Sequence, residues 1–247
     1  MNTAFAELKR VVCSFPFIIG VAFMTVICLI ASADGMVAAF EQAAPRGNHH
    51  LVFLHAVETS SLVQFAVPIL SVLSATTAFL DDTSSGYIKA YLPRTGKPAY
   101  IKAKIMSAIL SGGGTLFLGA LFSWIVTTCL LFPTELVSEA NEVPLYSGYK
   151  LLTVFILLFL NGACWSILGT LLASVTNSRY MAYASPFVTY YLLIILHERY
   201  FPNLVIIDPK KWLVMEVELY VRLVLIVVTI FLSVLFYIFA EKRLSNV

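Results

Sequence analysis

Apolar residues in this chain occur in long stretches that short polar segments separate. Six stretches are at least about 17 residues long, which is the length that a helix needs to cross the hydrocarbon core of a bilayer. They cover approximately residues 11–33, 59–80, 105–132, 151–175, 180–196 and 218–240. Backbone exposed to lipid must satisfy its own hydrogen bonds. The pattern therefore predicts an all-α membrane protein, a single transmembrane domain over residues 1–247 with six transmembrane helices.

Composition supports the membrane class. Hydrophobic residues make up 60% of the chain and charged residues 12%, against roughly 45–50% and 25% in soluble domains. The four cysteines, Cys13, Cys28, Cys129 and Cys164, all fall inside apolar stretches, which favours buried thiols over a zinc site. We expect membrane lipid as a partner and no nucleic acid.

The polar segments predict further elements. Residues 1–12 form an amphipathic pattern typical of a helix that lies in the membrane interface. An alternative is a cleavable signal peptide ending at Ala31-Ser32-Ala33, although the apolar stretch exceeds the usual length of about 7–15 residues. Residues 34–58 and 133–150 are predicted as polar outer loops, and Gly112-Gly113-Gly114 as a site of close helix packing or a local break.

The distribution of basic residues predicts the orientation. With the N-terminus inside, the cytoplasmic segments hold most of the 16 basic residues: Lys9, Arg10, Lys89, Arg94, Lys97, Lys102, Lys104, Arg179, Lys242 and Arg243. This bias follows the positive-inside rule. It predicts a multi-pass protein of the cell (plasma) membrane with both termini in the cytoplasm.

The apolar stretches lack chemistry of their own. Their central parts contain no Asp, Glu, Lys, Arg or His, whereas ion-coupled transporters commonly keep such groups at membrane depth. The chain has no phosphate-binding Gly-x-x-x-x-Gly-Lys-[Ser/Thr] loop and no Glu-x-x-His-type metal spacing. We expect no catalytic, metal or cofactor site in this chain. Four milder residues are candidates for a substrate route, or for ordinary packing between helices: Gln64, Asn161, Phe187 and Tyr190.

The most patterned polar segment is residues 81–104. Thr83, Ser84 and Ser85 offer N-caps for a short helix that Pro93 and Gly96 would end. Apolar side chains at helical spacing form an exposed stripe on that helix: Tyr87, Ile88, Tyr91 and Leu92. The basic residues that follow, including Lys104, could hold the loop at anionic headgroups. The stripe favours docking to a cytoplasmic partner over a simply solvated loop.

This segment also resembles a known family. The residues that carry the resemblance are Phe79-Leu80-Asp81-Asp82, Gly86, Leu92-Pro93-Arg94, Tyr100 and Lys104. They are similar to the loop after the second span of type-two ABC export permeases, compact six-span subunits of ABC transporters. The amphipathic N-terminal helix and a Pro-containing segment between spans five and six match the same family. The family would make residues 197–215 short re-entrant helices on the outer side.

The resemblance implies that the chain is the transmembrane permease subunit of an ATP-driven exporter. It would pair with a second copy or a similar permease and with two separate ATPase subunits, which would hold ATP and Mg. The residues implied in ATPase coupling are Asp82, Tyr87, Ile88, Tyr91, Leu92 and Arg94. Cargo would be amphiphilic: a peptide, an antibiotic or a lipid-like molecule.

Two other functions remain as alternatives. One is an immunity or sensing subunit that binds a toxic peptide with its outer loops and does not move it across the membrane. The other is an ion-coupled carrier, which the charge-free span centres disfavour. Loss of activity with a hydrolysis-dead ATPase partner would separate the exporter from the carrier.

Overall fold

The computed structural model describes residues 3–41, 48–134, 145–214 and 218–245. Every regular element within these ranges is a helix, which confirms the predicted all-α class. The α-helices are α1 (Thr3–Val12), α2 (Phe15–Glu41), α3 (Asn48–Thr59), α4 (Ser61–Leu70), α5 (Ala78–Ser84), α6 (Tyr87–Thr95), α7 (Lys97–Leu131), α8 (Leu145–Thr176), α9 (Arg179–Arg199) and α10 (Glu218–Ser245). Three short 3₁₀ helices are η1 (Phe132–Thr134), η2 (Val205–Ile207) and η3 (Pro209–Leu213).

Four helices, α2, α7, α8 and α10, are long and apolar enough to cross a membrane. The bent pair of α3 and α4 passes the same test as a unit, which gives up to 5 crossings. The 21-residue helix α9 falls short because its tyrosines, Ser185 and Pro186 reduce its mean hydropathy. The described part of the chain is therefore helical, with four or five segments that are long and apolar enough to cross a membrane.

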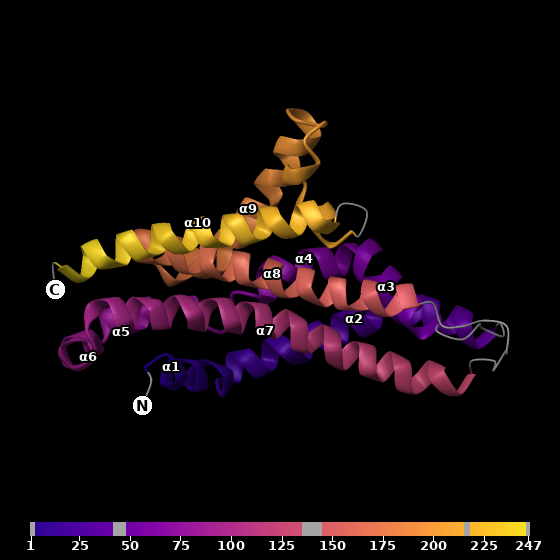
Figure 1. Cartoon of the computed structure of the whole chain (residues 1–247), viewed down its shortest axis with the longest axis horizontal. Coiled ribbons are helices and arrows are strands. Elements are labelled where there is room, and N and C mark those ends of the chain that lie inside the picture. The colour runs from indigo at the N-terminus through magenta and orange to yellow at the C-terminus, as the bar shows by residue number, and fades with distance from the viewer. Residues whose placement is uncertain (1–2, 42–47, 135–144, 215–217, 246–247) are drawn as a thin grey trace.

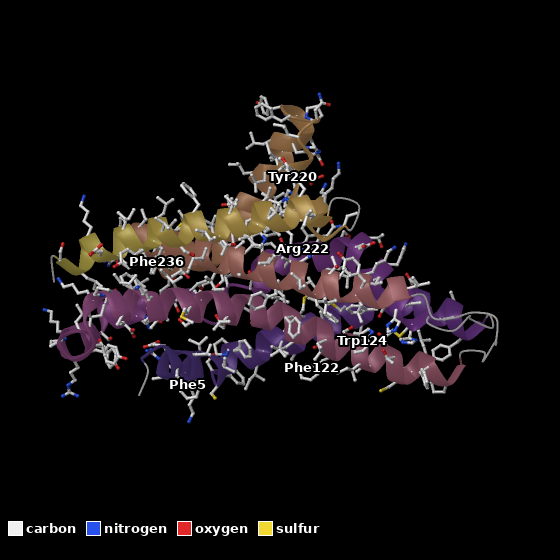
Figure 2. All side chains as sticks on the ribbon, in the orientation of Figure 1. Phe5, Phe122, Trp124, Tyr220, Arg222 and Phe236 are labelled. Carbon is white, nitrogen blue, oxygen red and sulfur yellow. The ribbon has the colours of Figure 1, made fainter. Side chains whose placement is uncertain are left out.

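The long helices lie side by side along one axis (Figure 1). In the most apolar stretch of α8, 67% of the residues are buried, against 28% in α2 and 22% in α10. Helix α8 is therefore the centre of the bundle, and α2 and α10 present apolar side chains outward. In Figure 2, Phe5 of α1 and Phe122 of α7 lie on the outside, whereas the fully buried Phe236 of α10 lies between α10 and α7.

The second predicted span, 59–80, is not one helix. The chain is already helical from Asn48, bends by 71° where Ser60 adopts an extended backbone, and leaves regular helix after Leu70. Pro68 lies inside α4, in its last turn. All of the described part of the predicted polar loop 34–58, residues 34–41 and 48–58, is also helical, so that prediction is wrong. The second predicted loop, 133–150, lies largely outside the described residues.

Helix α7 runs unbroken through Gly112-Gly113-Gly114, so the alternative of a local break is wrong and that of close packing is correct. A Cβ atom added to Gly113 would stand 2.8 Å from the carbonyl oxygen of Phe159 on α8. One added to Gly162 would stand 2.9 Å from the Cα atom of Gly113. Small residues let two membrane helices approach until their backbones touch, and here they join α7 to α8.

One end of the bundle gathers the polar helices. In Figure 1 the start of α1, the helices α5 and α6, and the last turns of α10 lie together at the left. We call this the α6 end. Both described ends of the chain are therefore at the same end of the bundle. The last part of α9 and the start of the segment after it stand away from the long helices (Figure 1). The chain then returns to the bundle at η3, where Trp212 stacks on Trp165 of α8 with ring centroids 5.7 Å apart.

We predict that Gly162→Ala will weaken the α7–α8 contact, because the new methyl group would overlap the backbone of α7. The expected loss of stability is about 1–3 kcal/mol, measured as thermal unfolding of the detergent-solubilised chain. Gly148→Ala is the control, since no atom lies within 4 Å of its added Cβ. Equal unfolding temperatures for the two variants would contradict the packing described above.

Candidate functional site

Lys104 is part of α7 and lies at the α6 end of the bundle, because α7 begins at Lys97 and not at residue 105 as predicted. Gly96 has a positive φ of 76°, which glycine adopts without strain, and Pro98 stands in the first turn of α7. Starting the helix at Lys97 places Tyr100 and Lys104 one turn apart on the same face. That face meets α1 and α5.

Lys104 lies between two carboxylates from distant parts of the chain. Its Nζ is 2.6 Å from Oδ2 of Asp82 on α5 and 2.9 Å from Oε2 of Glu7 on α1. Lys104 and Asp82 are each 2% exposed and Glu7 is 5% exposed. A single buried ammonium group therefore joins α1, α5 and α7.

Two further donors complete this cluster. The Tyr100 hydroxyl donates to Oδ2 of Asp82 at 2.9 Å, and Arg10 NH1 donates to Oδ1 at 3.1 Å. Arg10 NH1 also lies 3.8 Å from Oε1 of Glu7. We call Glu7, Arg10, Asp82, Tyr100 and Lys104 the buried ion network. Its two buried anions are matched by the buried cation of Lys104 and by Arg10, whose side chain is 53% exposed. Buried charges are tolerated when they are paired in this way.

The environment keeps Asp82 ionised. Burial alone would raise the pKa of its carboxyl group, but Lys104, Tyr100 and Arg10 together outweigh burial and hold this pKa below its ordinary value. Asp82 is therefore a permanent anion at neutral pH. It acts as an acceptor that fixes three donors, not as a proton carrier.

Helix α6 rests on this network through apolar and aromatic contacts. Ile88 is 2% exposed and belongs to a small buried cluster with Phe79, Tyr100 and Phe236. The Tyr91 ring meets the Tyr100 ring edge-on, with centroids 6.0 Å apart. Because Tyr100 also binds Asp82, α6 contacts a member of the network directly.

The predicted exposed stripe is only partly exposed. Tyr87 is 44% exposed and stacks on Tyr91 at 5.1 Å, whereas Tyr91 and Leu92 are half-buried. Ile88 is buried, so its prediction as an exposed docking residue is wrong: α6 needs one side chain to fix it on the bundle. Asp82 is likewise not a surface contact, because the network encloses it.

Two local predictions for the segment also need correction. Thr83, Ser84 and Ser85 lie at the end of α5 and donate to carbonyl groups of that helix, so they are not N-caps of α6. Pro93 lies within α6, which continues to Thr95 and ends at Gly96. Arg94 is exposed, as a flanking contact requires.

Sequence reasoning gave no site role to four members of the network, Glu7, Arg10, Tyr100 and Lys104, although Tyr100 and Lys104 are among the residues that carry the family resemblance. Lys104 was expected in a basic loop at the headgroups, and the structure buries it. The available signal was its position one turn after Tyr100 in a segment that can continue as a helix. Nothing local in the sequence indicates that Glu7, 97 positions earlier, is its partner.

The four candidate substrate-route residues do not contact one another. Gln64 donates to the carbonyl of Glu58 at 3.1 Å, and Asn161 donates to Leu157 of its own helix at 3.0 Å. Tyr190 is buried against Trp165, and Phe187 packs on Tyr191. Within the described part of the chain, no hydrogen bond or ring contact joins any two of the four.

Comparisons with known proteins add no family to this picture. No protein-family model, curated protein or solved structure matches this chain. Among the described residues there is also no group of three or more His, Cys, Asp or Glu side chains that could hold a metal ion. The buried ion network and the α6 surface above it are therefore the candidate functional site.

We predict that Lys104→Met will destabilise the chain, because two buried carboxylates would lose the cation between them. Breaking a buried ion pair from one side typically costs about 3–5 kcal/mol. Thermal unfolding in detergent measures the loss. Lys102→Met is the matched control, since Lys102 is exposed on the same helix. A Lys104→Met protein as stable as the Lys102→Met protein would show that the network does not hold the helices together.

The lowered pKa of Asp82 predicts the direction of a pH effect. An unfolded aspartate titrates near about 3.9, so the stability from Asp82 is fully present above that pH. It is lost as the pH falls through the lower pKa of the folded state. The stability difference between the wild type and Asp82→Asn should stay constant from pH 7 to about 5 and shrink below about 4. A difference that grows as the pH falls would contradict this sign.

Proposed function

We propose that this chain is the transmembrane permease subunit of an ATP-driven exporter of amphiphilic cargo. Helix α9 would be a further crossing beside the more apolar helices, giving six spans with both termini in the cytoplasm of the cell membrane. Helix α1 would lie in the cytoplasmic interface, and the segment with η2 and η3 would be re-entrant on the outer side. Partners would be two ATPase subunits and a second copy or a similar permease.

The observation that carries this proposal is the seating of α6. This short helix stands at the end of the bundle and contacts Tyr100, which shares Asp82 with Lys104 and Arg10. A displacement of α6 by a partner would reach α1, α5 and α7 through these contacts. Such an arrangement suits a subunit that receives mechanical work from another protein.

The outer surface of α6 supplies the contact for that partner. Tyr87 is 44% exposed and Arg94 is exposed on the same short helix. Aromatic and arginine side chains are the residues that most often dominate binding at protein interfaces. Nucleotide binding can shift the permease only through a difference in the affinity of the ATPase for its two conformations.

Truncation of Tyr87 tests the coupling contact more cleanly than truncation of Tyr91, which also packs on Tyr100. We predict that Tyr87→Ala will weaken ATPase binding by about 1–2 kcal/mol, by analogy with interface hot spots. The measurement is ATPase subunit recovered with the tagged chain from native membranes, together with transport in proteoliposomes.

Tyr200→Ala is the control for this experiment, because Tyr200 is 68% exposed just after α9, away from the α6 end. Tyr200→Ala should leave ATPase recovery unchanged. If Tyr87→Ala recovers as much ATPase as the control, the coupling surface is wrong. If the chain still moves cargo when its ATPase partner cannot hydrolyse ATP, the proposed function is wrong.

A further inference from the structure

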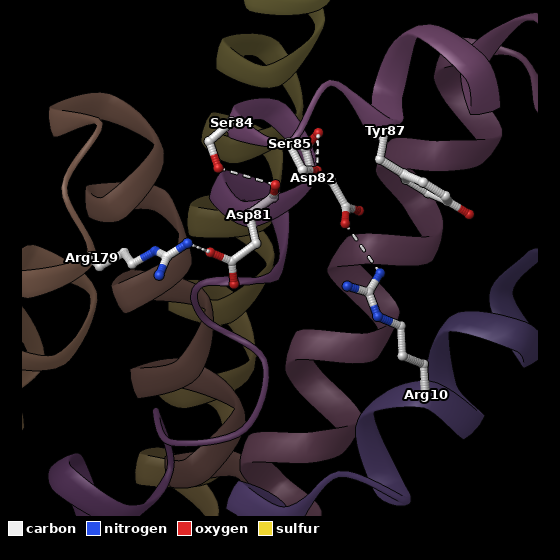
Figure 3. A pocket seen from close by; sticks show the side chains of 7 residues that line it. All are labelled: Arg10, Asp81, Asp82, Ser84, Ser85, Tyr87 and Arg179. Carbon is white, nitrogen blue, oxygen red and sulfur yellow. Dashed lines mark hydrogen bonds and ion pairs between the residues drawn. The ribbon is translucent and has the colours of Figure 1, made fainter.

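A polar cleft opens at the α6 end, between α1, the end of α5, the start of α6 and the start of α9 (Figure 3). Its volume is about 540 Å³, within the range of roughly 300–1,000 Å³ typical of small-molecule sites. Seven residues line it: Arg10, Asp81, Asp82, Ser84, Ser85, Tyr87 and Arg179. Most of these side chains are polar, whereas the long helices below are apolar.

The charged side chains in the cleft form two ion pairs, and each arginine keeps further N–H donors that these pairs do not use. Arg179 NH2 is 2.8 Å from Oδ1 of Asp81, and Arg10 NH1 is 3.1 Å from Oδ1 of Asp82. The arginine side chains are 65% and 53% exposed. Each guanidinium has five N–H donors, so a single paired nitrogen leaves others for a ligand. The cleft therefore offers positive donors on both sides of its carboxylates.

These groups suit a ligand that carries both signs of charge. Arginine forks match phosphate oxygens and bind them in pairs of hydrogen bonds. The side chain of Asp81 is 36% exposed, so it can also accept a hydrogen bond from an ammonium group. A purely anionic ligand would gain the arginines but would stand beside two carboxylates.

The lining also favours binding of a primary ammonium group over a quaternary one. A primary ammonium donates hydrogen bonds to carboxylate and hydroxyl oxygens, which Asp81, Ser84 and Ser85 supply. A quaternary ammonium has no N–H and is recognised by several aromatic rings, whereas Tyr87 is the one aromatic residue in this lining. We propose that the cleft binds the phosphoethanolamine headgroup of a membrane phospholipid.

The position of the cleft identifies a lipid as the source of this headgroup. Arg10 comes shortly before the apolar stretch that begins at Phe15, and Arg179 follows shortly after the one that ends at Thr176. Tyr180, beside Arg179, is 86% exposed. Tyrosines are enriched where a membrane protein meets the headgroup layer, and basic pockets there bind lipid headgroups. This binding is independent of the proposed transport function.

The test uses the purified full-length chain in nanodiscs that contain equal parts of phosphatidylethanolamine, phosphatidylcholine and phosphatidylglycerol. Native mass spectrometry counts the lipids that remain bound. We expect phosphatidylethanolamine in at least about tenfold excess over either other lipid, a preference of about 1.4 kcal/mol. Arg179→Gln and Asp81→Asn should each abolish the preference. Arg199→Gln, at the exposed far end of α9, is the matched control and should keep it.

Three results would overturn the inference. If phosphatidylglycerol is retained by the Asp81→Asn protein but not by the Arg179→Gln protein, the cleft is a simple anion site. Equal retention of the three lipids, or a preference that both variants keep, would show that this cleft is not the lipid site. Displacement of the lipid by an equal concentration of soluble glycerophosphoethanolamine would show that a free metabolite, not a lipid, is the ligand.

Discussion

The buried ammonium group of Lys104 is the constraint on which the α6 end depends. Glu7 and Asp82 have been removed from water, and neither carboxylate is tolerated there without a cation at hydrogen-bond distance. Lys104 meets this condition only while α1, α5 and α7 stay together. Such a network does not necessarily add much stability over an apolar core, but it is strongly penalised when separated. It therefore favours joint movement of these helices over independent movement.

Helix α6 gains its proposed role from this rigidity. It is too short and too polar to bury itself, and it is fixed by Ile88 and by the contact of Tyr91 with Tyr100. A partner that moves α6 would act on the network, and the network would carry the movement into α7. Close packing of Gly113 and Gly162 joins α7 in turn to the central helix α8. A chain whose span centres are free of charge can in this way respond to energy released elsewhere.

Sequence reasoning succeeded where one property of a segment decides its structure. The uninterrupted apolar stretches predicted α8 and α10 closely, because length and hydropathy suffice for a membrane helix. It failed where contacts with other parts of the chain determine the structure of a segment. The bend of 71° at Ser60 falls inside an apolar stretch, and no hydrophobic periodicity marks it. The same limit applies to the site: helical spacing found the stripe on α6, but which side faces the bundle depends on Phe79 and Phe236 from other helices.

The central claim is that the network holds α1, α5 and α7 together and so fixes α6 above them. A distance between α1 and α6 tests it most directly. Spin labels at Lys9→Cys and Lys89→Cys, both exposed positions, can be compared by double electron–electron resonance after Cys13 and Cys129 are replaced by serine. The account predicts one narrow distance distribution that broadens clearly when Lys104 is changed to Met. Equally narrow distributions in both proteins would contradict it.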